Sequence, residues 1–333
     1  MTDSSLMGDR TGVPRRATGA AGDAPRPPRE TQGSRRSLRP RTRSALVTWA
    51  FILPAAVYLL VFFGYPILSN LTMSFQDFTT STFFTGEAPW VGFDNYVAVV
   101  GSGLFAKLTA NTAIFTIVSL AFTFLIGLGL ALFFNRHFPL NKVLRALLLL
   151  PWLLPLIISS AVWRRMMEGE TGILNVVLEG LGLSGVSWLT NPDIALYSII
   201  IVNIWVGIPF VMVIIYGGLQ EIPKDYYEAA ALDGATGWRS FASITWPLLR
   251  PVVVVVLMLG FIYTIRVLDI ILALTGGGPA NATETYASRA YHLSFVNFEF
   301  GRGAALSNIL IVVSLIVAAF QLRANKRASD LAG

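Results

Sequence analysis

Apolar stretches of about 20 residues, separated by shorter polar segments, occupy most of the chain. A helix of that length crosses the hydrocarbon core of a bilayer, whereas barrel strands would alternate apolar and polar residues over about 10 positions. The pattern therefore predicts an all-α, polytopic membrane protein with six transmembrane helices. They are expected at Ala45–Ile67, Ala110–Phe134, Val143–Val162, Ala195–Tyr216, Val252–Ala273 and Ala304–Leu322.

The two ends of the chain differ from the membrane domain expected at 45–325. Residues 1–44 hold ten of the 25 basic residues and four of the 19 acidic ones, so the net charge of +6 lies here. This segment cannot bury a core, which predicts a disordered cytoplasmic tail beside anionic lipid rather than a nucleic-acid-binding module. Its twin arginines, Arg35 and Arg36, do not indicate a signal peptide, because the span that follows is too long. Residues 326–333 are expected to form a second cytoplasmic tail.

The distribution of basic residues predicts the orientation in the membrane. With the N-terminus inside the cell, 19 Lys and Arg residues lie on the cytoplasmic side and five lie outside. Without the N-terminal tail the ratio is still nine to five. Cytoplasmic segments of membrane proteins carry an excess of basic residues. Both termini are therefore expected in the cytoplasm.

Three connections that are expected on the outer side contain short sequence patterns that predict local structure. The sequence PWVGFDNY (Pro89–Tyr96) predicts a folded connection anchored by aromatic residues. Within residues 163–194, four apolar residues at helical spacing predict a short interfacial helix. These four are Ile173, Val176, Val177 and Leu181. The Gly-rich stretch Leu274–Thr285 is expected to be flexible and to lack regular structure.

The connection between the fourth and fifth spans, residues 218–250, is longer and more structured than a simple linker requires. Pro223 suits the first turn of a helix, and Gly234 suits the left-handed geometry of a helix end. Thr236 can cap a second short helix that ends before Pro247. We interpret the connection as a helix–turn–helix that a soluble cytoplasmic partner can bind. An ordinary amphipathic linker is the alternative.

A spaced motif runs through this connection: Glu-Ala-Ala, three residues, Gly, nine residues, Ile, one residue, and an apolar residue before Pro. The positions are Glu228, Ala229, Ala230, Gly234, Ile244 and Pro247, with Trp246 where Leu is usual. The motif resembles that of permeases of binding-protein-dependent ABC importers, and the resemblance extends over residues 45–325. Val91–Tyr96, Ile222–Ala235 and Leu274–Pro279 further resemble the carbohydrate-uptake subfamily of the maltose and glycerol-phosphate permease type.

The resemblance implies a type I ABC importer permease fold in the plasma membrane of a bacterium. It also implies several partners: a second permease subunit, two cytoplasmic ABC ATPase subunits, an extracytoplasmic solute-binding protein and a sugar or sugar derivative. ATP and Mg would be bound by the ATPase, and no cofactor by this chain. The residues expected at the ATPase are Glu228, Ala229, Ala230, Asp233, Gly234, Ile244 and Pro247. The extra N-terminal spans and large insertion of Gram-negative maltose permeases are absent here, so the chain is more similar to shorter six-span members.

Single features of the sequence also fit two other classes of protein, an intramembrane protease and a secondary transporter. No Lys follows a Gly, so a phosphate-binding P-loop is not expected, and the absence of Cys excludes thiolate chemistry. The string Gly182-Leu183-Ser184-Gly185 matches that of intramembrane serine proteases, with His292 as an imagined base. A stand-alone secondary transporter would need an ion-coupling acid in the membrane, for which Asp269 is the candidate. A secondary transporter would leave the structured cytoplasmic connection without a purpose. The four-residue protease string arises easily by chance, and its Ser184 is expected in a polar outer loop.

Polar residues inside the predicted spans are candidates for the solute pathway. Arg266 and Asp269 are three positions apart and are expected on one face of the fifth helix, either lining the pathway or forming an ion pair. The other candidates are Asn203, Trp205, Ser307 and Asn308. Amides and hydroxyls also join helices to one another, so both interpretations stay open. Gly127 and Gly129 are expected to allow close helix packing.

Overall fold

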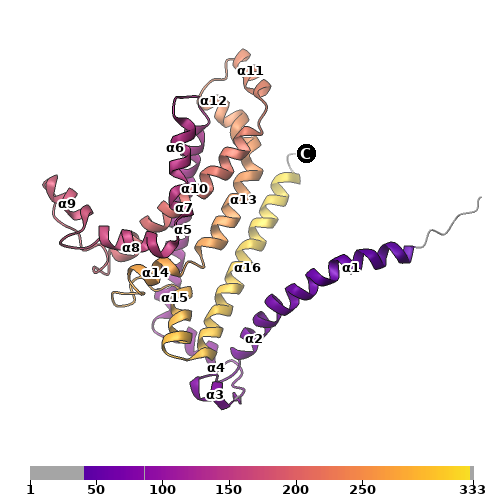
Figure 1. The fold of residues 1–333 in the computed structure, drawn as a ribbon, viewed down its shortest axis with the longest axis vertical. Coiled ribbons are helices and arrows are strands. Elements are labelled where there is room, and N and C mark those ends of the chain that lie inside the picture. The colour runs from indigo at the N-terminus through magenta and orange to yellow at the C-terminus, as the bar shows by residue number, and fades with distance from the viewer. Residues whose placement is uncertain (1–40, 86, 331–333) are drawn as a thin grey trace, which may run out of the picture. The chain divides into compact units, whose positions relative to one another are not determined.

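The computed structural model describes residues 41–85 and 87–330, with side chains from residue 50 to residue 323 apart from residue 86. Among these residues the only strand-like pairings are two isolated bridges, Gln76–Trp90 and Thr79–Glu299, so the predicted all-α class is confirmed. The helices in Figure 1 are α1 (Arg41–Leu59), α2 (Tyr65–Met73), α3 (Thr80–Thr85), α4 (Asp94–Val100), α5 (Phe105–Phe134), α6 (Asn141–Leu148), α7 (Leu150–Leu153), α8 (Leu156–Met166), α9 (Ile173–Gly180), α10 (Ala195–Gln220), α11 (Lys224–Leu232), α12 (Trp238–Ser240), α13 (Trp246–Thr264), α14 (Asp269–Leu274), α15 (Tyr286–Tyr291) and α16 (Phe300–Asp330). Short π-helical turns lie at Leu60–Gly64, Phe241–Thr245 and His292–Val296.

The chain divides into two units, residues 1–57 and residues 58–333. The part of the first unit that the structure describes belongs to α1, where Phe51 is 80% exposed. The two predicted tails fall largely on residues 1–40 and 331–333, which lie outside the described residues. Residues 41–44 and 326–330, which were assigned to the tails, are helical in α1 and α16. Arg and Lys have high helix propensity, so basic residues need not end a helix.

Five helical segments of the described chain are long and apolar enough to cross a membrane. They are Ala50–Met73, Phe105–Phe134, Ala195–Gln220, Trp238–Thr264 and Phe300–Arg323. The third predicted span is not one straight helix: Asn141–Leu153 and Leu156–Met166 meet at an angle of 96°, and the pair makes a sixth span only if both pieces count as one. Pro155 follows Leu154, whose ψ of 141° is extended, because a residue before Pro is disfavoured in the helical region.

The fifth predicted span is also interrupted. The helix that contains its first part begins earlier, at Trp238, and ends at Thr264. Residues 265–268 are not helical, and α14 begins at Asp269. Arg266 and Asp269 therefore do not lie on one continuous helical face, as the sequence had suggested. They lie at the break between α13 and α14.

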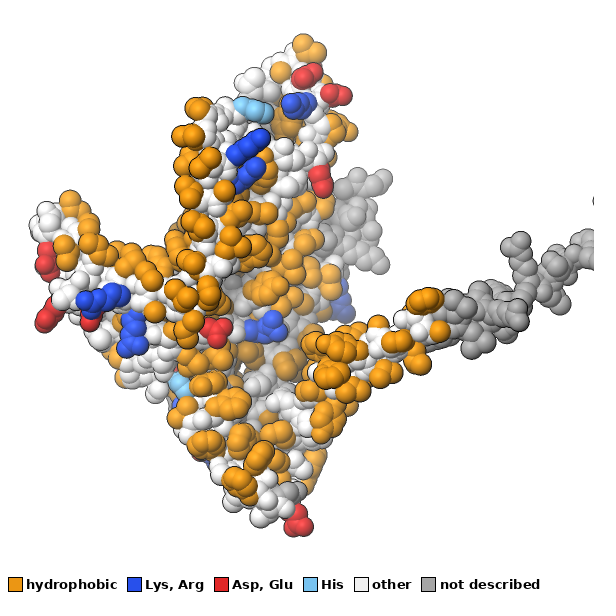
Figure 2. Space-filling view, viewed as in Figure 1, with side chains coloured by type: hydrophobic (Ala, Val, Ile, Leu, Met, Phe, Trp, Pro, Cys, Tyr) orange, Lys and Arg blue, Asp and Glu red, His pale blue; other side chains and the backbone are white. Residues whose placement is uncertain are grey.

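One hydrophobic core cluster of the second unit lies between α5, α10 and α13. Buried residues from these helices form one cluster, which includes Ala131, Met212, Ile215 and Leu249. In Figure 1 α11 and α12 lie at one end of these helices, and α14 and α15 lie toward the other. In Figure 2 hydrophobic side chains cover most of the visible face between, while charged side chains gather near α11 and around α8 and α9. This distribution is what a bilayer around the middle of the helices requires.

Glycine allows close approach at one of the two positions predicted for it. A Cβ at Gly127 would lie 2.6 Å from Val211 Cγ1 on α10, so only glycine fits there without displacement. At Gly129 no atom lies within 4 Å of the corresponding position. Gly127 and Gly129 are two residues apart and point to different sides of α5, so the prediction is wrong for Gly129.

Of the three connections that were expected on the outer side, one is more ordered than predicted and two are as predicted. The ring of Phe75 stacks on Trp90, and the Asn95 side chain donates to the carbonyl oxygens of Ser74 and Gln76, so the aromatic connection is folded. The helix predicted around Ile173 is α9. Residues 275–284 lack helix and strand, as expected, but Thr283 is fully buried. The expectation that this stretch is flexible is wrong, because its polar groups are held inside the protein.

Candidate functional site

The connection at residues 218–250 carries two helices joined by a turn, and it is the first part of the candidate site. α11 begins after Pro223, which is its N-cap, and ends before Gly234. Gly234 has a φ of +73°, a left-handed conformation that disfavours side chains with a Cβ. The second helix, α12, begins at Trp238 with Gly237 as its N-cap instead of Thr236. The predicted helix–turn–helix is therefore present, with its second start shifted by one residue.

The second helix does not end before Pro247, as the sequence predicted. It continues through the π-helical turn Phe241–Thr245 into α13, so one helical segment runs from Trp238 to Thr264. In the π-helical turn the backbone N–H of Trp246 donates to the carbonyl oxygen of Phe241, five residues earlier. Proline at position 247 has no N–H to donate, and a wider turn of this kind accommodates such an interruption.

Much of the surface of this connection is not covered by other residues of the described chain. Glu228, Ala229, Asp233 and Gly234 are exposed, and the Leu232 side chain is 91% exposed. Trp238 is also exposed, at 77%. The apolar side chains of Leu232 and Trp238 are therefore left uncovered by the described part of the chain. Of the other two motif residues near α13, Ile244 packs against the core cluster and Pro247 is exposed.

A cavity of about 730 Å³ lies among α5, α7, α10, α13 and α14, and it is the second part of the candidate site. Three predicted pathway residues, Asn203, Arg266 and Asp269, line it. Aromatic rings from three elements contribute to its wall: Trp152, Phe210 and Tyr263. The Phe210 ring centroid lies 6.1 Å from that of Trp152 and 5.9 Å from that of Tyr263, so the three rings form a continuous surface.

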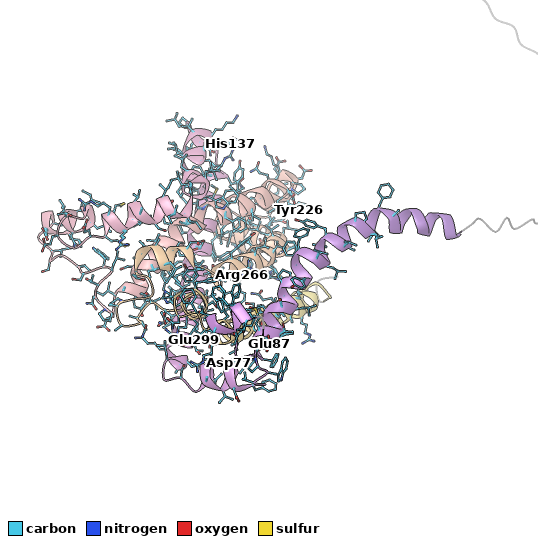
Figure 3. All side chains as sticks on the ribbon, turned by 60° about the horizontal axis from the view of Figure 1, so that its bottom comes forward. Asp77, Glu87, His137, Tyr226, Arg266 and Glu299 are labelled. Carbon is cyan, nitrogen blue, oxygen red and sulfur yellow. The ribbon has the colours of Figure 1, made fainter. Side chains whose placement is uncertain are left out.

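The two charged residues of the cavity do not neutralise each other. No ion pair within 4 Å joins Arg266 to Asp269 in the described residues, so the ion pair considered from the sequence is absent. The Arg266 Nε donates to the carbonyl oxygen of Ile262, 3.2 Å away. In Figure 3 Arg266 lies between two groups of labelled residues, with His137 and Tyr226 on one side and Asp77, Glu87 and Glu299 on the other. Arg266 and Asp269 are both exposed, so each side chain is accessible to a third group.

The remaining predicted pathway residues lie elsewhere. The Trp205 ring packs edge-on against Trp163, with centroids 5.6 Å apart. Asn308 joins helices: the Asn70 amide donates to its side-chain oxygen at 2.8 Å, and its own amide donates to the Tyr96 hydroxyl at 3.3 Å. Ser307, beside it on α16, is half-buried. None of Trp205, Ser307 and Asn308 lines the cavity.

Sequence reasoning missed a buried acid, Glu284, in the stretch that it took to be flexible. The Glu284 side chain is 3% exposed, one carboxylate oxygen lies 2.6 Å from His292 Nδ1, and the other lies 3.6 Å from the Arg289 guanidinium. The amide of Asn111 on α5 donates to the backbone oxygens of Ala282 and Glu284. The sequence carried no signal for this burial, since Glu284 lies in a run of small and polar residues. The Nδ1 atom of His292 is thus engaged with the buried carboxylate.

No group of three or more His, Cys, Asp or Glu in the described part of the chain is arranged to hold a metal ion. Residues 123–330 match the family described as the binding-protein-dependent transport system inner membrane component. The chain belongs to this family. It is an importer permease subunit rather than an enzyme, and the ATPase resides in a separate chain. Together with its apolar helices, the family makes it a multi-pass inner membrane protein.

Curated relatives match over most of the chain. The trehalose/maltose transport system permease protein of Thermococcus litoralis is 37% identical and aligns with 86% of this chain and 96% of its own length. The sulfoquinovosyl glycerol transport system permease protein of Agrobacterium fabrum is 35% identical over 84% of this chain and 90% of its own. The diacetylchitobiose uptake system permease protein of Streptomyces coelicolor is 31% identical over 87% of this chain and 90% of its own.

Solved structures show the same fold. A crystal structure of a bacterial ABC transporter involved in the import of the acidic polysaccharide alginate matches with a TM-score of 0.75 and 25% identity, covering 86% of this chain and 96% of that one. A second alginate transporter structure, in complex with a periplasmic protein that holds an alginate pentasaccharide, matches with a TM-score of 0.74 and 24% identity. The type I importer permease fold is therefore confirmed. A secondary transporter or an intramembrane protease is not favoured.

Proposed function

We propose that this chain forms half of the membrane pathway of an ATP-driven sugar importer. The observation that carries the proposal is the family membership together with relatives of at least 31% identity that are named for the transport of sugars or sugar derivatives. The partners would be a second permease subunit, two cytoplasmic ATPase subunits that bind ATP and Mg, and an extracytoplasmic solute-binding protein.

The chemistry of the cavity supports a sugar as the solute. Sugars offer hydroxyl groups that both donate and accept hydrogen bonds, and apolar ring faces that stack on aromatic side chains. Asn203 and Asp269 supply acceptors, and Arg266 supplies donors in a fixed planar arrangement. The wall of Trp152, Phe210 and Tyr263 supplies the aromatic surface. Of the predicted pathway residues, we propose solute contacts for Asn203, Arg266 and Asp269.

The cytoplasmic connection supports coupling to the ATPase. We propose that α11 seats in a cleft of the ATPase subunit through its exposed residues Glu228, Ala229 and Asp233, while Ala230 lies half-buried on the other face of the helix. Gly234 sets the turn that follows. ATP binding would close the ATPase pair and move this connection, opening the permease pair outward beneath the binding protein. Hydrolysis would return the pair to its inward state. The turn after α11 leads into α12, and α12 and α13 are parts of one helical segment, so the connection is continuous with Tyr263 at the cavity.

This mechanism requires that both termini and the connection 218–250 face the cytoplasm. The positive-inside distribution of basic residues supports that orientation. Cysteine labelling from either side of the membrane tests it, because the chain has no cysteine of its own. We expect a cysteine at Leu232 to react only from the cytoplasmic side.

Purification of the tagged chain from its native membrane tests the proposed function. We expect a second permease and an ATPase to co-purify, and the ATPase activity in lipid with the binding protein to rise with one member of a panel. The panel would hold trehalose, maltose, diacetylchitobiose, sulfoquinovosyl glycerol and alginate oligosaccharide. Stimulation should fall in Asn203→Ala and Asp269→Asn, while Asn191→Ala, in an outer loop, should respond as the natural sequence does. Purification without an ATPase, or no response to any sugar, would contradict the proposal.

A further inference from the structure

One hydrogen bond between side chains ties the docking helix α11 to the beginning of the fifth membrane span. The hydroxyl oxygens of Tyr227 and Thr245 lie 3.0 Å apart, although the residues are separated by 18 positions. Thr245 is buried, with 5% of its surface exposed. The Tyr227 ring packs against the core cluster that includes Met212 and Leu249. A hydrogen bond shielded from water is stronger than the same bond in water, so this one fixes the two elements relative to each other.

The bond lies on the inner face of α11. Tyr227 and Ala230 are three residues apart, lie on the same side of the helix and are half-buried. Glu228, Ala229 and Leu232 are exposed. One face of α11 is therefore fixed to the membrane domain, while the other stays free for a partner.

Thr245 is the last residue of the π-helical turn through which α12 continues into α13. Such turns weaken a helix locally, and sharp bends in helices often occur at them. Pro247 follows within the next turn and has no backbone N–H to reinforce it. Without a brace, a force applied at the docking face would bend the helix here. The Tyr227 hydroxyl reaches this point from the neighbouring helix.

We propose that Tyr227 and Thr245 are positioning residues for energy coupling. Their hydrogen bond makes α11, the π-helical turn and α13 move as one lever, so that displacement of the docking face reaches the cavity at Tyr263 instead of being lost at the turn. The inference rests on the proposed function, because it assigns a part of the coupling path to two residues that do not themselves bind ATPase or solute.

The assembled transporter in lipid, with its ATPase subunits and binding protein, gives the first test. Tyr227→Phe and Thr245→Val remove one hydroxyl each and keep the packing, and Ser243→Ala is the control. Ser243 lies in the same π-helical turn, but its hydroxyl donates to the Arg239 carbonyl oxygen. The measured quantity is the number of sugar molecules transported per ATP hydrolysed, with the panel sugar that stimulates most. The net free energy of one hydrogen bond corresponds to about a three- to tenfold change in an equilibrium constant. We therefore expect each variant to lower the ratio of transported sugar to hydrolysed ATP by that factor.

The double variant separates coupling from general damage. If the two hydroxyls act as one unit, Tyr227→Phe with Thr245→Val should be no worse than either single variant. The amount of co-purified ATPase should stay unchanged throughout, and Ser243→Ala should keep the natural ratio. An unchanged ratio in both single variants would overturn the proposal. Loss of assembly in both would also overturn it, because the bond would then serve folding.

A distance measurement gives a second test that does not depend on the solute. Because the chain has no cysteine of its own, spin labels attach only to cysteines that are introduced. We choose Ala231→Cys on α11 and Val255→Cys on α13, since both residues are exposed. We expect a narrow distance distribution in the assembled transporter and a broader one with Tyr227→Phe. Equal widths would overturn the proposal. No sugar stimulation in the natural sequence would instead count against the proposed function, and the distance distribution would still decide whether the bond braces the turn.

Discussion

Replacing Gly127 with alanine should weaken the contact between α5 and α10. The added Cβ would lie 2.6 Å from Val211 Cγ1, 2.8 Å from Val211 Cβ and 3.3 Å from the backbone nitrogen of Met212. Carbon atoms in contact prefer about 3.5–4.0 Å, so α10 would have to move away by about 1 Å. Val211 and Met212 belong to the main core cluster, where such overpacking costs about 1–3 kcal/mol.

Gly129→Ala is the matched control, because no atom lies within 4 Å of a Cβ there. Both substitutions gain the same helix propensity, so the difference between them isolates the contact with α10. We expect Gly127→Ala to be less stable than Gly129→Ala by about 1–3 kcal/mol in thermal or denaturant unfolding of the purified chain in detergent. Adding Val211→Ala to Gly127→Ala removes the closest contact but keeps the Val211 Cβ contact, so stability should return in part. Equal stability of the two alanine variants would show that α5 and α10 do not pack as described.

Two further predictions concern the side chains of Glu284 and Asn175. Glu284→Ala leaves His292 and Arg289 without their buried carboxylate and should cost about 2–4 kcal/mol of stability. Glu299→Ala, which removes an exposed pair with Arg302, should cost less than about 1 kcal/mol in the same unfolding assay, and equal losses would contradict the burial of Glu284. Asn175→Ala removes four hydrogen bonds, to Gly169, Val186 and Trp188, and should speed limited proteolysis within residues 169–188. Asn191→Ala, which removes one exposed bond to Asp193, should not, and similar cleavage rates in both would mean that Asn175 does not hold the loop.

The sequence was sufficient for the helical class and for most of the membrane spans, because the bilayer demands long apolar helices whatever surrounds them. It also predicted α11 and its end at Gly234, since helix ends depend on local residues. It failed at Pro155 and at Thr264, where apolar composition continues across a break in the helix. Composition measures how well a residue tolerates lipid, and it says little about the direction of the backbone.

The candidate site, like the fold, could be predicted from the sequence only in part. The docking motif could be located from the spacing of a few residues, because the surface that it forms is continuous in sequence. Asn203 and Arg266 were identified as polar residues within apolar spans, but their common cavity depends on how α10 and α13 pack. Asn308 carried the same signal and instead joins α2 to α16. The burial of Glu284 depends on Asn111, which is more than 170 positions away along the chain, and no local pattern reports such a contact.

Sugar-stimulated ATP hydrolysis by the assembled transporter, with Glu228→Lys compared with Glu221→Lys, tests coupling most directly. Both glutamates are exposed and both substitutions reverse one charge, but only Glu228 belongs to the motif. We expect Glu228→Lys to abolish stimulation and uptake while the chain stays inserted in the membrane, and Glu221→Lys to keep both. Gly234→Pro should act like Glu228→Lys, because proline cannot adopt the φ of +73°. Normal stimulated hydrolysis and uptake in Glu228→Lys would contradict a coupling role for this connection.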